Sequence, residues 1–120
     1  MKVIIAGSRS LPVDHPAIYY VADAYLKSGL KATEIVSGGC RGVDLAGEAF
    51  AQERGIPIKR FIPDWDTHGK AAGPIRNKQM AEYGDALIAI WDGISRGTGS
   101  MVSYAEAKKL RVFIYYIGPE

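Results

Sequence analysis

The chain contains little that would point to a compartment or to a polyanionic partner. Its 120 residues include one cysteine, Cys40, which excludes an intrachain disulfide. The apolar run within residues 1–7 is too short for a signal peptide or a membrane span, so we expect a cytoplasmic protein with no membrane partner. The net charge is only +2, which by itself gives no reason to expect nucleic acid.

Residues that could hold a metal are also scarce. The two histidines, His15 and His68, lie far apart, and neither has a cysteine or a carboxylate at the spacing of a zinc site. Cys40 has no recognisable histidine partner, so we interpret it as a small residue in a glycine turn rather than as a nucleophile. We therefore expect no metal site and no cofactor.

The composition is that of an ordinary globular protein. Hydrophobic residues make up 48% of the chain and charged residues 23%, and a chain of this length can bury a core. No internal repeat or low-complexity segment is visible. We expect a single domain over residues 1–120.

Apolar runs rich in β-branched residues alternate along the chain with segments of helical periodicity. Residues 63–73 show neither pattern, and we predict a long loop there. The predicted strands are residues 2–6, 34–36, 58–62, 86–91 and 112–117. The predicted helices begin after Asp14, near Leu45, at Pro74 and after Thr98, and they end at Gly29, Gly55, Gly84 and residues 108–111.

This alternation predicts an α/β fold, a Rossmann-like three-layer sandwich with a five-stranded parallel sheet of order 3-2-1-4-5. In that order the strand sequence reverses between strands one and four. Ligands of such sheets bind near this point, outside the carboxyl ends of the strands. We therefore expect the loops after the first, second and fourth strands to form a ligand site.

The stretch SGGCRGVD, residues 37–44, is a glycine-rich turn between the second strand and the second helix. Its glycines allow positive φ and a close approach, while the helix that follows offers free N–H groups and a positive dipole end. Arg41 adds a charge with bidentate geometry. The turn predicts an anion site, and a tight turn with a solvated arginine is the alternative that these residues alone leave open.

Four of the seven arginines fall at the same predicted edge of the sheet. Arg9, Arg41 and Arg96 lie in loops that follow strands, and Arg76 opens the third helix. A basic rim on a nearly neutral protein predicts a phosphorylated ligand. The alternative is that these arginines only make the surface loops soluble.

Arg76 stands on one predicted helical face with Met80 and Tyr83. If that face is buried, the guanidinium needs an anion, because an unpaired buried charge is costly. The anion is either a ligand phosphate or the carboxylate of Asp44, which would make a structural ion pair.

Aromatic and acidic residues near this edge leave further roles open. Trp65 could stack on a nucleobase or cover the edge of the sheet. Asp64, Asp66 and Asp92 could bond a ribose or only solvate their loops.

These residues resemble the SLOG superfamily, specifically its small YspA-like or YpsA-related branch. The similar motifs are SGGCRGVD at 37–44, DW at 64–65, GKAAGPIRN at 69–77 and SRGT at 95–98, and the resemblance covers nearly the whole chain. The superfamily is Rossmann-like and includes the LOG cytokinin-activating phosphoribohydrolases, the DNA-processing protein of natural transformation, and sensor domains. The resemblance implies a sensor or adaptor that binds a nucleotide or an ADP-ribose-derived molecule.

The LOG enzymes carry an Arg-Lys-x-x-Met element and a Pro-Gly-Gly-x-Gly-Thr-x-Glu-Glu element, whose arginine and first glutamate are catalytic. Residues 76–80, RNKQM, are similar, and Gly97-Thr98 match the second element, but Ser100 and Met101 replace the glutamates. Without a carboxylate there, cleavage of a ribosyl C–N bond lacks its obvious stabiliser and base. The catalytic residues are therefore unassigned, and a nucleoside 5′-monophosphate phosphoribohydrolase is the alternative function. The carboxylates that could substitute are Asp44, Glu48 and Glu106.

We expect a small-molecule partner rather than nucleic acid, because the basic residues form a rim without interleaved aromatics. We also expect a homodimer, since Tyr19, Tyr20 and Tyr25 give the first helix more aromatic surface than a small monomer usually exposes. The residues predicted to bind the ligand are Gly7, Ser8, Arg9, Gly38, Gly39, Arg41, Gly42, Asp44, Trp65, Arg76, Asn77, Ser95, Arg96, Gly97 and Thr98.

Overall fold

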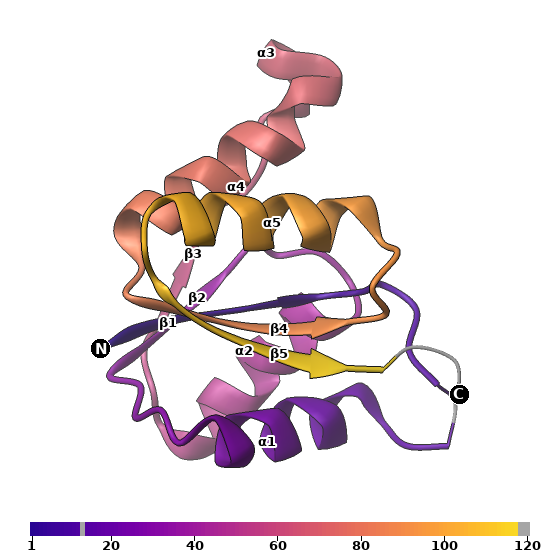
Figure 1. The fold of residues 1–120 in the computed structure, drawn as a ribbon, viewed down its shortest axis with the longest axis vertical. Helices are drawn as coiled ribbons and strands as arrows, with labels where there is room; N and C mark the ends of the chain where they lie inside the picture. The colour runs from indigo at the N-terminus through magenta and orange to yellow at the C-terminus, as the bar shows by residue number, and fades with distance from the viewer. Residues whose placement is uncertain (13, 118–120) are drawn as a thin grey trace.

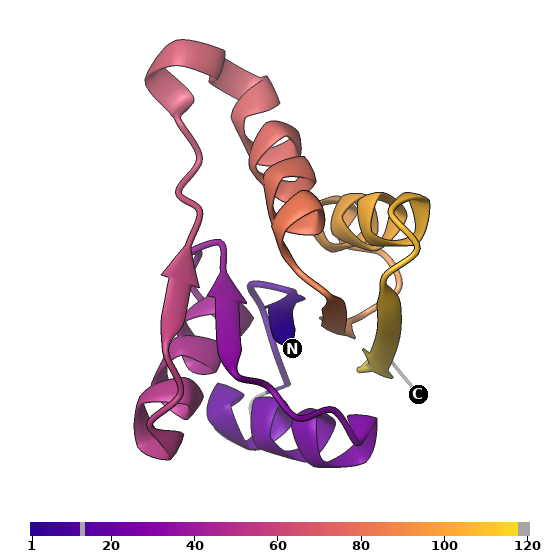
Figure 2. The same ribbon diagram turned by 90° about the vertical axis from the view of Figure 1, so that its left-hand side faces the viewer.

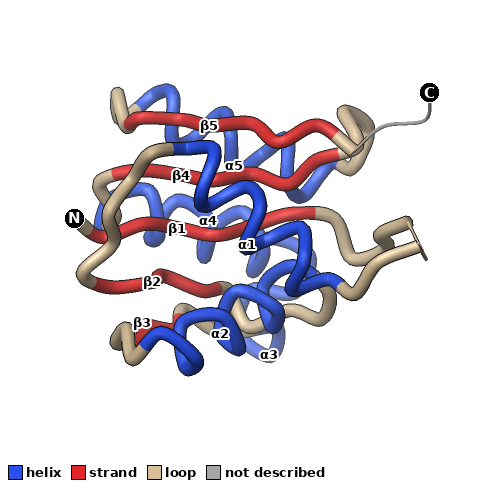
Figure 3. The backbone as a smooth tube through the Cα atoms, turned by 90° about the horizontal axis from the view of Figure 1, so that it is seen from below, coloured by secondary structure: helices blue, strands red, loops and turns tan. Residues whose placement is uncertain are grey.

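The computed structural model describes residues 1–12 and 14–117, which form a five-stranded parallel sheet between two layers of helices (Figure 1). The strand order is β3-β2-β1-β4-β5, which can be followed in Figure 3. The fold class and the strand order predicted from the sequence are confirmed. The strands are β1 (Lys2–Gly7), β2 (Glu34–Ser37), β3 (Ile58–Arg60), β4 (Ala86–Trp91) and β5 (Arg111–Tyr116).

The central strand β1 explains why the apolar runs are continuous. It pairs with β2 on one side and β4 on the other, with Val3 opposite both Ile35 and Ala86. Val3 and Ile5 belong to the core on one face of the sheet, and Ile4 belongs to the core on the other. Because side chains alternate along a strand, a sheet covered on both faces needs an apolar residue at every position.

Figure 2 shows the sheet from its side, with one pair of helices below it and another above. The lower layer is α1 and α2, and the upper layer is α4 and α5. Among the described residues, none of the helices has the length and apolarity that crossing a membrane would require. The helices are α1 (Ala17–Ser28), α2 (Val43–Arg54), α3 (Trp65–His68), the 3-10 helix η1 (Gly69–Ala71), α4 (Ala72–Tyr83) and α5 (Arg96–Ala107).

The predicted helix ends are confirmed where glycine was the signal. Gly29 and Gly55 follow α1 and α2 in the left-handed conformation, with φ of 69° and 68°. A residue without Cβ adopts this conformation with little strain. Gly84 follows α4 as predicted, although its backbone is extended.

The predicted helix starts were less accurate. Asp14 is not the N-cap of α1, because Pro16 holds that position and the Asp14 carboxylate instead accepts a hydrogen bond of 2.9 Å from the Tyr20 hydroxyl. Thr98 is not the N-cap of α5 either: Ser95 takes this place, and Thr98 lies buried in the first turn. Both serine and threonine suit an N-cap, so the sequence did not distinguish the two positions.

Three segments differ from their predicted extent. The third strand was predicted over residues 58–62, but β3 ends at Arg60. Residues 63–73 are not a loop, since α3, η1 and the start of α4 occupy most of them. The Asp64 side chain caps α3 by accepting a hydrogen bond of 3.1 Å from the Thr67 amide. The last helix ends at Ala107 rather than at 108–111, because Lys109 is left-handed with φ of 59° and Arg111 already begins β5.

The tyrosines of α1 offer less free surface than expected. Tyr20 is buried, and Tyr25 packs against Phe50 with ring centroids 5.1 Å apart. Only Tyr19 of the three is exposed, and it stacks on His15. The homodimer stays a prediction. Of the three tyrosines that suggested it, Tyr19 alone is exposed on the surface of α1.

Candidate functional site

A cleft of about 700 Å³ opens at the carboxyl edge of the sheet, beside the ends of β1 and β4. This is the point where the strand order reverses, and the volume suits a small molecule. The lining residues are Ala6, Gly7, Ser8, Arg9, Ser10, Cys40, Asp44, Trp65, Gly73, Pro74, Arg76, Asn77, Met80, Asp92, Ser95, Arg96, Gly97, Thr98, Ser100 and Met101.

Most of the residues predicted to bind a ligand line this cleft. The exceptions all lie within residues 38–42 of the glycine turn, where Cys40 is the one residue that belongs to the lining. Met80 and Met101 also line the cleft and are almost fully buried, and they were not among the predicted ligand-binding residues. The predicted residues outside the lining are Gly38, Gly39, Arg41 and Gly42.

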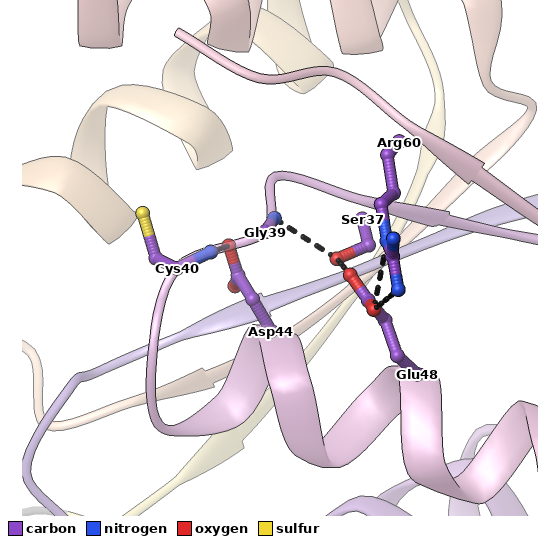
Figure 4. Close-up of polar contacts among 6 residues, drawn as sticks. All are labelled: Ser37, Gly39, Cys40, Asp44, Glu48 and Arg60. Atoms are coloured by element: carbon purple, nitrogen blue, oxygen red, sulfur yellow. Dashed lines mark hydrogen bonds and ion pairs between the residues drawn. The ribbon is translucent and has the colours of Figure 1, made fainter.

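Two amides of the glycine turn are bonded to side chains of the turn and its flanks. The Gly39 amide donates a hydrogen bond of 3.0 Å to Ser37 Oγ, and the Cys40 amide donates one of 3.2 Å to Asp44 Oδ2 (Figure 4). Gly39 and Gly42 have φ of 74° and 84°, which explains the glycines without invoking a ligand. The negative group at this turn is therefore the Asp44 carboxylate of the chain itself.

Arg76 is buried, with 8% of its surface exposed, and it lies beneath the same turn. Its Nη1 donates a hydrogen bond of 2.6 Å to the Gly38 carbonyl oxygen, and its Nε donates one of 3.0 Å to Asn77 Oδ1. Asn77 Nδ2 in turn donates one of 3.3 Å to the Gly97 carbonyl oxygen. Arg76 and Asn77 thus join the glycine turn and α5 across the cleft, and the ion pairs found among the described residues do not include Arg76 with Asp44.

Asp44 is the strongly perturbed carboxyl of the site. Burial raises its pKa to about 6, against the opposing effects of the Cys40 amide and the nearby Arg76 and Arg9 cations. Only 7% of its surface is exposed. A buried, perturbed carboxyl in a cleft is a common feature of functional sites.

The other substitute carboxylates do not reach the cleft. Glu48 accepts hydrogen bonds from Ser37 Oγ at 2.7 Å and from Arg60 Nε at 2.9 Å, as Figure 4 shows. Glu106 lies exposed at the far end of α5. Asp44 is therefore the one member of the three that lines the cleft.

The first turn of α5 forms the opposite wall of the cleft. Its first residues, Arg96 and Gly97, are exposed. The preceding loop is fixed by Asp92 Oδ1, which accepts a hydrogen bond of 2.7 Å from the Ser95 amide, and this bond is the main cause of a lowered pKa at Asp92. The first N–H groups of a helix have no partner within the helix and carry a partial positive charge.

Ser100, at the position of the LOG glutamate, also lines the cleft. The first turn of α5 therefore offers amides, hydroxyls and an arginine, and none of its residues is acidic. Within residues 1–12 and 14–117, no three His, Cys, Asp or Glu side chains gather closely enough to hold a metal ion.

Comparison with solved structures supports the topology. The X-ray structure of DNA processing protein A (DprA) from Streptococcus pneumoniae matches with a TM-score of 0.73 and 21% sequence identity. The match covers 94% of this chain and 49% of that chain, so this chain spans about half the length of DprA. A likeness at this level of identity shows the fold alone.

Comparison with known sequences supports the family. The Gene 61 protein of Mycobacterium phage D29 is 27% identical over 122 residues, which cover 98% of this chain and 96% of that protein. A profile of the family described as "YspA, cpYpsA-related SLOG family" matches residues 1–68, more than half of the sequence. The chain belongs to this SLOG family.

Proposed function

We propose that the chain binds a nucleotide-derived small molecule in the cleft, as a sensor or adaptor, with the phosphate at the first turn of α5. The observation that carries the proposal is the meeting of a helix N-terminus with two exposed arginines, Arg9 and Arg96, in one cleft at the switch point. Free N–H groups and guanidinium forks are the groups that bind phosphate in proteins.

The N-terminus of α2 suits a ligand phosphate less well. Asp44 already accepts the Cys40 hydrogen bond there, and its carboxylate would repel a second negative group. Arg76 is engaged by the Gly38 carbonyl oxygen below this turn. At α5 the carboxylate that lines the cleft is Asp92, which accepts hydrogen bonds from the Ile94 and Ser95 amides before the helix begins. The helix itself has Ser100 where the LOG enzymes have a glutamate.

Arg96→Ala is expected to weaken the binding of a nucleoside 5′-monophosphate by about tenfold, because a charge-assisted hydrogen bond contributes roughly 1.5 kcal/mol or more. Calorimetric titration with the adenosine, guanosine, cytidine and uridine monophosphates and with ADP-ribose measures the effect. Arg111→Ala is the matched control, since Arg111 is exposed at the amino end of β5, on the opposite edge of the sheet.

Two results would contradict the proposal. One is the absence of binding of any of these compounds to the wild-type chain. The other is tighter binding of a single-stranded oligonucleotide than of every mononucleotide, which would favour a nucleic acid partner.

Hydrolysis of the N-glycosidic bond is the second candidate function, and Asp44 is the observation that favours it. Its carboxyl lies in the cleft with a pKa of about 6, which suits a general base near neutral pH. Incubation with the same monophosphates, followed by chromatography, separates the two functions. Free base from the wild type, absent with Asp44→Asn, assigns hydrolysis, whereas recovery of intact nucleotide assigns binding alone.

A further inference from the structure

Asp44 has one oxygen that is not used within the chain. Its Oδ2 accepts the Cys40 hydrogen bond, and Oδ1 accepts no hydrogen bond from the described residues. Among the described residues, no fully buried side-chain nitrogen or oxygen lacks a hydrogen-bond partner, so Oδ1 without a partner is not fully buried. Oδ1 is therefore open to the cleft that Asp44 lines. When the carboxylate is ionised, this oxygen accepts hydrogen bonds and cannot donate one.

The lining of the cleft includes a group suited to each part of a nucleotide. Trp65 lines the cleft with its ring close to Gly73, and 51% of its surface is exposed, so the ring is accessible to an aromatic base. The first turn of α5 suits the phosphate. Asp44 lines the same cleft with 7% of its surface exposed, and it supplies an acceptor for the sugar that joins the base to the phosphate.

We propose that Asp44 recognises the ribose hydroxyls of the ligand, so that the cleft selects ribonucleotides over deoxyribonucleotides. The inference rests on the function proposed above and adds the sugar to it. A ribose 2′- or 3′-hydroxyl donates to Oδ1 and replaces water at a carboxylate that burial has already partly desolvated. A sugar without that hydroxyl leaves the mostly buried carboxylate without this partner, and an unpaired buried polar group is what lets a site discriminate strongly.

The chain holds Asp44 rigidly enough for such a role. Its other oxygen is tied to the Cys40 amide, and the turn that carries Cys40 is fixed by Arg76 through the Gly38 carbonyl oxygen. Gly42, with φ of 84°, packs against the backbone of Arg9, where a Cβ would lie 2.8 Å from the Arg9 carbonyl oxygen. The carboxylate is thus positioned by three separate elements of the fold.

The test compares adenosine 5′-monophosphate with its 2′-deoxy and 3′-deoxy forms by calorimetric titration, and repeats the comparison with the guanosine series. The wild type is expected to bind the ribonucleotide at least about tenfold more tightly than one of the deoxy forms. Asp44→Ala should bring the three affinities together. Asp44→Asn retains an acceptor oxygen, so it should keep part of the preference.

Equal affinity of the wild type for all three forms would overturn the inference without any variant, while leaving the phosphate site intact. An unchanged preference in a folded Asp44→Ala protein would also overturn it. If neither the ribose nor the deoxyribose forms bind, the proposed function itself fails, and the two failures are thereby distinguished.

Discussion

Replacing Arg76 by alanine is expected to lower the free energy of unfolding by about 2–4 kcal/mol, the range for breaking a buried hydrogen-bond network. The Gly38 carbonyl oxygen would lose its 2.6 Å partner, and Asn77 Oδ1 would lose a 3.0 Å partner. The removed side chain would also leave a cavity beneath the glycine turn, because Arg76 is buried there.

Urea denaturation of the wild type and of Arg76→Ala measures this change, with Arg111→Ala as the exposed control that should change little. Arg76→Lys keeps the charge but loses the planar fork, so it should recover only part of the stability. Calorimetric titration of the folded variant separates stability from binding. An unchanged free energy of unfolding combined with a ten- to hundredfold loss of nucleotide affinity would instead show that Arg76 holds the phosphate.

The fold could be predicted because its signals are local. After Lys2, the runs that form β1 and β4 contain no polar side chain, and the helices between strands leave a parallel sheet as the one simple arrangement. The position of the cleft followed from the strand order, which itself rests on the usual winding of such sheets. Neither step required knowledge of a specific side-chain contact.

The partners of the site residues depend on contacts distant in sequence. The sequence placed Arg76 near an anion but could not show that the partner is a carbonyl oxygen 38 positions away. It placed Asp44 in the glycine turn, but it could not show that the carboxylate accepts a hydrogen bond from the Cys40 amide. The structure shows that one negative group at this turn, the Asp44 carboxylate, belongs to the chain itself.

One missed element did have a local signal. Asp64 and Thr67 stand three residues apart, which is the spacing of an N-cap side chain and the amide it accepts from. The absence of apolar periodicity hid this signal, because α3 is exposed throughout and has no buried face to produce it.

Replacing Asp44 by asparagine is expected to stabilise the fold at neutral pH and to change how its stability depends on pH. The folded pKa of Asp44 is raised to about 6, mainly by burial, whereas the pKa of an aspartate in an unfolded chain is about 3.9. Between these values the folded state binds more protons than the unfolded state. Stability from this group is therefore greatest below about pH 4 and is lost as the pH rises through about 6, by roughly 3 kcal/mol in total.

Asparagine has the same shape and can still accept from the Cys40 amide, but it does not ionise. The difference in unfolding free energy between Asp44→Asn and wild type should therefore increase from about pH 4 to pH 7 and level off above it. Carboxyls with lowered pKa, such as Asp23 and Asp92, are shared by both proteins and cancel in the difference.

Urea denaturation at one-unit steps from pH 4 to pH 8 measures this profile. Asp66→Asn is the matched control, because it removes one carboxylate from an exposed position on α3 and should give a flat difference. A flat difference for Asp44→Asn as well would mean that Asp44 is as well solvated in the folded protein as in the unfolded chain. Its carboxylate would then carry no desolvation for a ligand hydroxyl to relieve, and the ribose preference would lose its physical basis.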